Sequence, residues 1–380
     1  MFLGRKTWIS FAVLGAILVN FTTMKTYSDQ PYWTSFNLCM LLSLPYTCLA
    51  HLWVFGIQGQ RNIINEPNTL IEEKKEKKVA IVTGSNTGIG FETAKTLVLD
   101  YGWEVILACR SHDKAVQAME AINRELPTEN PGRAVVLDQP LDLSSFESVQ
   151  AFSKKIETKY TKIDALVNNA GRNTSGKSGE FNLLFQSNFL GHFLLTNILL
   201  DKLKGGGRIV NLSSVMHHFS GTQSKLTDYW KSVALYSPDQ PTETYSASKL
   251  GAILFTNELN RRFGKSHAIR SIAVNPGSCA SDIWRGFPKL MKAVFRTVYL
   301  SPKQGSAPAV AATVQSDWDS DVVYLQPYWM PGDSIPLPFT EMMGPYVGHR
   351  PTVPRLPPGG GLQEATALWD LSYELTKKFS

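Results

Sequence analysis

The chain has 380 residues, enough for one α/β domain with appendages, and its 43% hydrophobic content excludes wholesale disorder. The formal net charge of +6 is compatible with contact with anionic lipid or phosphate. The sequence contains no long Lys/Arg run and no zinc-finger spacing, so we expect no nucleic-acid partner.

The first 60 residues contain two apolar segments. Residues 7–23 carry no charged side chain, and residues 33–57 carry none apart from the protonatable His51. The first segment is at the short limit for a membrane-spanning helix, and the second is long enough. We expect residues 1–60 to form a hydrophobic membrane hairpin. The alternatives are one span with an interfacial helix, or a cleaved signal peptide at the first segment.

Basic residues flank these segments. Arg5 and Lys6 precede the first one, and Arg61 with the cluster Lys74–Lys78 follows the second. Basic flanks favour the cytoplasmic side, so two spans would place the N-terminus and the rest of the chain in the cytosol. We therefore predict a membrane location, in the endoplasmic reticulum, with membrane lipid as a contact and the catalytic domain facing the cytosol.

A polar linker is expected at residues 61–78, followed by one domain at 79–380. From Val79 onward, short β-branched runs alternate with longer amphipathic stretches, which is typical of repeated βα units. Strands are expected at 79–82, 104–108, 134–137, 165–167, 208–212, 271–274 and 321–325. Helices are expected at 90–99, 182–203, 244–263 and 363–378. This pattern predicts a doubly wound, seven-stranded parallel α/β sheet of the Rossmann type, with a proline-rich, irregular surface excursion at 326–361.

A glycine-rich loop follows the first expected strand. It runs from Gly84 to Gly90, with a third glycine at Gly88, and leads into a helical stretch. Glycine lets the backbone turn tightly and lets a pyrophosphate approach, while the N-terminus of the helix offers N–H groups and a positive dipole end. Because a strand precedes the loop and a helix follows it, we predict a dinucleotide site here.

The end of the second expected strand carries Cys109 and Arg110 and no carboxylate. An NAD-specific site of this type has an acidic residue near this place, which binds the ribose hydroxyls. A guanidinium would instead pair with a 2′-phosphate and stack on adenine. Arg110 therefore favours NADP(H) over NAD(H), and the alternative interpretation is an ordinary solvated arginine.

Tyr245 and Lys249 lie four residues apart, hence on one face of the helix expected at 244–263. Tyr373 and Lys377 have the same spacing, so spacing alone decides little. A free tyrosine ionises near pH ~10, and a nearby lysine cation lowers that value. Tyr245 can then donate a proton during carbonyl reduction or remove one during alcohol oxidation.

A pair of serines, Ser213 and Ser214, ends the strand expected at 208–212. In an open parallel sheet, reactive groups gather at the carboxyl ends of the strands. Side chains alternate along a strand, so one of the two serines should point toward the site. Ser214 is the candidate that binds the substrate oxygen.

Together, these segments resemble the short-chain dehydrogenase/reductase superfamily across residues 78–314. The matching strings are TGSNTGIG at 83–90, NNAG at 168–171, NLSS at 211–214 and YSASK at 245–249. The resemblance implies a catalytic tetrad of Asn188, Ser214, Tyr245 and Lys249, in which the asparagine helps to hold a water beside the lysine. The cofactor-binding residues that it implies are Thr83, Gly84, Ser85, Asn86, Thr87, Gly88, Ile89, Gly90, Arg110, Asp142, Leu143, Asn169, Ala170, Gly171, Tyr245, Lys249, Pro276, Gly277 and Ser281.

The strings LACR (107–110), GHFLLT (191–196) and RIVNLSSVMHH (208–218) resemble the retinol-dehydrogenase-like enzymes and the oxidoreductase half of the WW-domain oxidoreductase. That subgroup implies a membrane-associated, NADP(H)-dependent oxidoreductase, which interconverts a lipophilic, retinoid-like alcohol and its aldehyde or ketone. Alternatives are a steroid, fatty-acyl or polyisoprenoid carbonyl reductase, and a membrane-bound nucleotide-binding scaffold. A homo-oligomer is compatible with each of these functions.

Three histidines need a separate interpretation. His217 and His218 have no Cys, Asp or Glu at ligand spacing, so we predict no metal site. His192 lies one turn after Asn188 and is interpreted as helix packing rather than as a second base.

Overall fold

A computed structural model of the chain describes residues 77–220, 226–237, 243–281, 283, 299–315, 323–328, 348–351, 354, 356 and 361–379. The two apolar segments at 7–23 and 33–57, and the linker up to residue 76, lie outside the described residues. Within the part that is described, no helix has the length and apolar character needed to cross a membrane.

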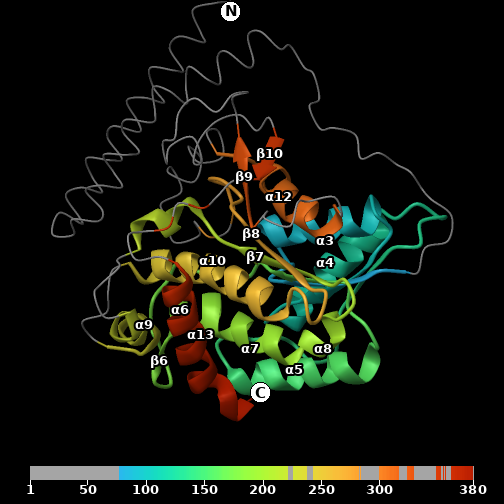
Figure 1. Cartoon of the computed structure of the whole chain (residues 1–380). Helices are drawn as coiled ribbons and strands as arrows, with labels where there is room; N and C mark the ends of the chain where they lie inside the picture. Colours follow the sequence, from blue (N-terminus) through green and yellow to red (C-terminus); the bar gives the residue numbers. More distant parts are fainter. Residues whose placement is uncertain are drawn as a thin grey trace, which may run out of the picture.

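One sheet runs through the centre of the molecule, with the strand order β10-β9-β8-β7-β4-β1-β2-β3 (Figure 1). Seven of its strands pair in parallel, as predicted. They are β1 (Val79–Thr83), β2 (Glu104–Ala108), β3 (Arg133–Val135), β4 (Ala165–Asn168), β7 (Arg208–Leu212), β8 (Arg270–Val274) and β9 (Tyr324–Tyr328). The chain lays β2 and β3 on one side of β1 and the later strands on the other, so the strand order reverses between β1 and β4.

The eighth strand, β10 (Gly348–Pro351), pairs antiparallel with β9 at the edge of the sheet. The sequence predicted an irregular excursion at 326–361, and this prediction is wrong for β10 and for the last residues of β9. Proline lacks an N–H, which an edge strand does not need on its outer side. Pro351 lies in this edge strand, and Pro327 lies beyond Tyr324 and Leu325, the two residues of β9 that pair with β8. Both prolines are therefore tolerated, and their presence made the segment resemble an irregular one.

Helices cover both faces of the sheet (Figure 1). One face carries α3 (Gly88–Leu99), α4 (His112–Arg124) and α12 (Pro302–Val314). The other carries α5 (Phe146–Lys159), α7 (Gly191–Ile198) and α10 (Thr244–Phe263). Here α13 (Leu362–Thr376) packs on α10, and α9 (Leu226–Ala234) packs on α13. Both faces are covered, so the central strands are buried almost throughout, as parallel strands require.

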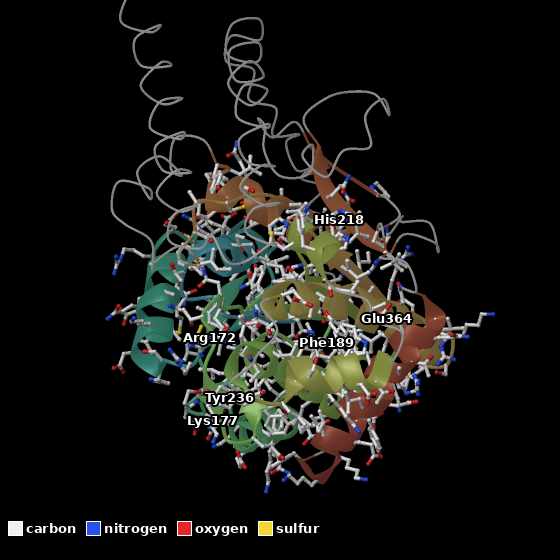
Figure 2. The ribbon with its side chains drawn as sticks, turned by 90° about the vertical axis from the view of Figure 1, so that its left-hand side faces the viewer. Arg172, Lys177, Phe189, His218, Tyr236 and Glu364 are labelled. Carbon is white, nitrogen blue, oxygen red and sulfur yellow. The ribbon has the colours of Figure 1, made fainter. Side chains whose placement is uncertain are left out.

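The helix predicted at 182–203 is divided into several elements. After the hairpin of β5 (Lys177–Ser178) and β6 (Phe181–Asn182), the chain forms α6 (Leu183–Phe185), the π-helical turn η1 (Gln186–Leu190), α7 and α8 (Leu200–Leu203). In η1 the Gly191 N–H donates to the Gln186 carbonyl, five residues back. Phe189, in this turn, packs against Phe185, Phe193 and Phe255 in the middle of the helix layer (Figure 2).

Two short 3₁₀ turns complete the described part: η2 (Val215–Phe219), directly after β7, and η5 (Lys377–Phe379) at the C-terminus. The N-cap residue of η2 is Ser214, whose hydroxyl oxygen accepts the Met216 N–H. The first turn of the segment after β7 is thus fixed by the same serine that the sequence places at the site.

A buried carboxylate joins α13 to α10. Glu258 of α10 is fully buried, and it accepts hydrogen bonds from Arg261, Arg262 and Thr366 at 2.6–3.2 Å. Burial alone would raise the pKa of Glu258, but these hydrogen bonds and the charge of Arg262 hold it below its usual value. The guanidinium of Arg262 also stacks over the ring of Trp369, at 4.7 Å.

Replacing this carboxylate should loosen the C-terminal helix. We expect Glu258→Gln to lower the free energy of unfolding at neutral pH by on the order of 1.5–3 kcal/mol, because charge-assisted hydrogen bonds are lost. A carboxyl group whose pKa is lower in the folded protein than in the unfolded chain stabilises the fold at pH values above its unfolded-state pKa. This stabilisation disappears as the pH falls through the folded-state pKa. The melting temperatures of the wild type and of Glu258→Gln, measured on the full chain, should therefore converge as the pH is lowered from neutral to acid. The exposed Glu120→Gln on α4 is the control, and a constant difference at all pH values would contradict the assignment.

Candidate active site

The predicted site residues lie at the carboxyl ends of the parallel strands, on both sides of the point where the strand order reverses. Thr83 ends β1, Asn169 follows β4, Ser213 follows β7 and Asn275 follows β8. An open parallel sheet binds its ligands in the crevice at such a point. The fold therefore brings together segments that lie almost 200 residues apart in the sequence.

The glycine loop is fastened to the end of β4. The side-chain amide of Asn169 donates to the carbonyl of Thr83 at 2.7 Å, and Gly84 N–H donates to Ala108 O of β2 at 2.8 Å. Gly84 has a φ of 65°, which a residue with a side chain rarely adopts. A Cβ there would also lie 2.9 Å from the Cα of Ala170.

The loop packs so closely at Gly90 that a residue with a side chain would not fit there. A Cβ on Gly90 would lie 2.3 Å from the Asn169 amide nitrogen and 2.6 Å from the Gly84 carbonyl. α3 begins at Gly88, and the side chain of its N-cap residue Thr87 makes no capping hydrogen bond. α3 thus begins just after the carboxyl end of β1, and the N–H groups and positive dipole end of such a helix terminus suit the pyrophosphate of a dinucleotide.

Other predicted cofactor contacts lie around this loop. Ser281 is beside Gly88, since a Cβ on Gly88 would lie 3.5 Å from the Cβ of Ser281. Leu141 N–H donates to Cys109 O at 3.0 Å, which brings Asp142 and Leu143 to the end of β2. Asp142 itself accepts hydrogen bonds from the backbone N–H and the hydroxyl of Ser144.

Arg110 is exposed at the end of β2, directly before the N-cap of α4. Among the described residues, its guanidinium has no hydrogen bond or ion pair. A cation at the carboxyl end of β2, next to the glycine loop, is placed where the sequence analysis expected one.

Lys249 is the buried cation of the site. Its Nζ donates to the carbonyl of Leu212 at 3.0 Å and lies 5.6 Å from the centre of the Tyr245 ring. The side chain is 6% exposed, and burial lowers the pKa of Lys249 to about 8. The ammonium is therefore still mostly protonated at neutral pH, and its positive charge favours the phenolate form of Tyr245.

Asn188 lies close to Lys249, across Gly171. A Cβ on Gly171 would lie 3.7 Å from Lys249 Nζ and 3.8 Å from Asn188 Oδ1. The carboxamide of Asn188 holds both backbone groups of Arg172: it accepts from the N–H at 2.8 Å and donates to the carbonyl at 2.9 Å. Asn188 thus fixes the segment after β4 through the backbone of Arg172, a residue labelled in Figure 2.

The structure separates the two candidate serines. The Ser213 hydroxyl donates to the backbone carbonyl of Lys249 at 2.8 Å and is buried. The Ser214 oxygen accepts from Met216 N–H at 3.2 Å, and its hydroxyl hydrogen has no acceptor within the described residues. Ser214 can therefore donate to a substrate oxygen, whereas Ser213 supports the lysine.

Some predicted cofactor residues point inward. The side chains of Thr83 and Ser85 are fully buried, and the Ser85 hydroxyl donates to Val82 O at 2.8 Å. These residues can face a ligand only through their backbone. Gly277, after Pro276, has its N–H bonded to Asn275 Oδ1 at 3.0 Å, which shapes the segment after β8.

Several supporting groups were missed by the sequence analysis. They are the Leu212 carbonyl, the backbone of Arg172 and the hydroxyl of Ser248, which lies 3.4 Å from the Asn188 amide. Backbone groups carry no residue-type signal, so no motif could have revealed the first two. Ser248 lies inside the YSASK string, whose spacing was used for its tyrosine and lysine alone.

A family model and several known proteins match this chain. The family model described as short chain dehydrogenase matches residues 78–225. Retinol dehydrogenase 11 of Homo sapiens is 38% identical over 236 residues, covering 60% of this chain and 70% of that protein. Retinol dehydrogenase 11 of Mus musculus is 35% identical over 279 residues (71% and 82%), and the WW domain-containing oxidoreductase of Gallus gallus is 37% identical over 245 residues (61% and 57%).

The family model covers the glycine loop and the strands from β1 to β7, and the matches agree with the resemblance seen in the sequence motifs. The chain therefore belongs to the short-chain dehydrogenase/reductase superfamily of oxidoreductases, in its retinol-dehydrogenase-like subgroup.

Proposed function

We propose that this chain is an NADP(H)-dependent oxidoreductase that interconverts a lipophilic, retinoid-like alcohol and its aldehyde or ketone. The observation that carries the proposal is the buried ammonium of Lys249, held by Leu212 O and facing the ring of Tyr245, next to the segment that supports the glycine loop. A scaffold that merely held nucleotide would have no chemical need for a desolvated cation beside a phenol.

Proton transfer is assigned to Tyr245. In carbonyl reduction its hydroxyl donates a proton to the substrate oxygen, and in alcohol oxidation its phenolate removes that proton. Lys249 favours the phenolate through its charge, and Ser214 donates a hydrogen bond to the same substrate oxygen. A bound nicotinamide supplies or accepts the hydride, while the protein contributes position and electrostatics.

The family binds NAD or NADP, and we infer a preference for NADP(H) from Arg110. The guanidinium is exposed at the end of β2 and has no partner among the described side chains. A planar fork of N–H donors matches the oxygens of a 2′-phosphate, and a carboxylate that would select ribose hydroxyls is absent from this strand end.

The substrate class and the membrane location rest on the relatives and on the sequence. Retinol dehydrogenase is the name of the relatives that match at 35–38% identity, which supports a lipophilic alcohol as the substrate. The apolar segments at 7–23 and 33–57 support attachment of the chain to a membrane, where such substrates dissolve. We propose that the catalytic domain faces the cytosol.

The function can be tested by measuring NADPH consumption by membranes that contain the full chain, against a panel of lipophilic aldehydes and ketones. Tyr245→Phe should lower turnover by roughly 10²–10⁴-fold, since the general acid is removed, and should leave nucleotide binding nearly intact. Tyr373→Phe is a matched control, because Tyr373 also has a lysine four residues later but is half exposed on α13. Near-normal turnover of the Tyr245 variant would refute the catalytic assignment.

Cofactor choice should respond to Arg110. A charge-assisted contact with a phosphate is worth on the order of 1.5–3 kcal/mol, so Arg110→Asp should weaken NADPH binding by roughly ten- to a hundredfold. The affinity for NADH should change much less. The control is Lys114→Asp on the exposed first turn of α4, which alters the charge nearby but not at the strand end. An equal loss for both nucleotides would mean that Arg110 is structural.

The orientation can be tested by protease treatment of sealed microsomes. The basic flanks of the apolar segments predict that the domain after Arg61 is digested without detergent. Protection of this domain until detergent is added would place it on the opposite side of the membrane.

A further inference from the structure

A buried histidine links the two halves of the site. His192 of α7 is 4% exposed and lies one helical turn after Asn188. Its Nδ1 is 3.1 Å from the backbone carbonyl of Asn188, and its Nε2 is 2.9 Å from Oγ1 of Thr83. One ring therefore spans the distance between the π-helical turn η1 and the end of β1.

The partners determine which nitrogen carries the proton. A carbonyl can only accept, so Nδ1 must be the donor toward Asn188. On the other side, Thr83 Oγ1 accepts the backbone N–H groups of Asn169 and Ala170, both at 2.9 Å, and these use both lone pairs of the hydroxyl. The hydroxyl hydrogen is then donated to Nε2, the nearer acceptor, rather than to Val167 O at 3.3 Å.

A protonated ring would not fit this arrangement. An Nε2–H would direct a third donor at the Thr83 oxygen, whose lone pairs are already used. Burial lowers the pKa of His192 to about 4, an effect that the hydrogen bond to Asn188 partly offsets and the charge of Lys249 reinforces. His192 is thus neutral at physiological pH and does not serve as a second base.

We propose that His192 is a positioning residue, which holds the proton-transfer residues in register with the dinucleotide loop. On one side, Asn188 fixes Arg172 and adjoins Lys249 across Gly171. On the other, the Thr83 hydroxyl holds the Asn169–Ala170 segment, against which Gly84 packs. The ring joins these two supports, so its loss would let the phenol and the cofactor loop shift relative to each other. This inference rests on the proposed function.

Variants of His192 can separate positioning from stability. His192→Leu removes both hydrogen bonds, His192→Asn keeps a donor near the Nδ1 position, and His192→Gln keeps an acceptor near the Nε2 position. The control is Thr313→Val on α12, on the other face of the sheet, which removes a buried hydrogen bond to the carbonyl of Ala309. All four should be made in the full chain and assayed for nucleotide affinity, kcat and melting temperature.

We expect His192→Leu to lower kcat on the order of 10²-fold, because small misplacements of reacting groups cost that much, and the Asn and Gln variants to recover part of the loss. Thr313→Val should keep the wild-type kcat even where it lowers the melting temperature. A loss of kcat that simply follows melting temperature in all four variants would overturn the proposal.

A spectroscopic readout keeps the proposal testable even if His192→Leu does not fold. In the full chain labelled with ¹⁵N-histidine, the signal that the His192→Asn variant lacks should report a neutral, Nδ1-protonated ring that does not titrate between pH 5 and 8. A protonated Nε2, or a titration in that range, would overturn the proposal. If the wild type reduces no carbonyl with either nucleotide, the proposed function fails, and the tautomer together with nucleotide affinity then decides the role of His192 alone.

Discussion

The close approach of two strand ends organises this molecule. β1 and β4 are neighbours in the sheet although 81 residues separate the last residue of one from the first of the other. The Asn169 amide, bonded to Thr83 O, closes the approach, and it leaves no room for a Cβ at Gly90. The glycine loop thus takes its shape from a residue that the chain reaches only after three further strands, β2, β3 and β4. This contact places the start of α3 at the crevice.

The helix layer opposite α3 sets the chemistry of the site through burial. α10 is covered by the sheet on one side and by α13 on the other, and Lys249 is nearly excluded from water. Desolvation reduces the preference of an ammonium for its charged form, while the Leu212 carbonyl compensates one of its N–H groups. Burial in the same helix layer lowers the pKa of His192, so its imidazole is neutral. The site therefore combines one partly desolvated cation with polar groups whose partners are backbone atoms.

Much of the fold could be read from the sequence, because alternation of β-branched runs and amphipathic stretches reports burial directly. The seven parallel strands and α10 lie close to their predicted ranges. The stretch predicted as one helix at 182–203 shows the limit of such reasoning. Its apolar periodicity is compatible with an uninterrupted helix, yet the π-helical turn at Gln186–Leu190 shifts the register by one residue. The contacts around this turn come from distant parts of the chain, since the Asn188 side chain bonds to the backbone of Arg172 and Phe189 packs against Phe255.

The sequence by itself determined the class of chemistry, since a phenol and an ammonium one turn apart, a serine after a strand and a glycine-rich loop are sufficient to indicate it. The tertiary structure decided which serine is available, because Ser213 is used by the backbone of Lys249 and Ser214 is not. It also turned His192 from a packing residue into a link between Asn188 and Thr83. The physical reason is that hydrogen-bond partners, and the burial that shifts a pKa, are set by residues far away in the chain.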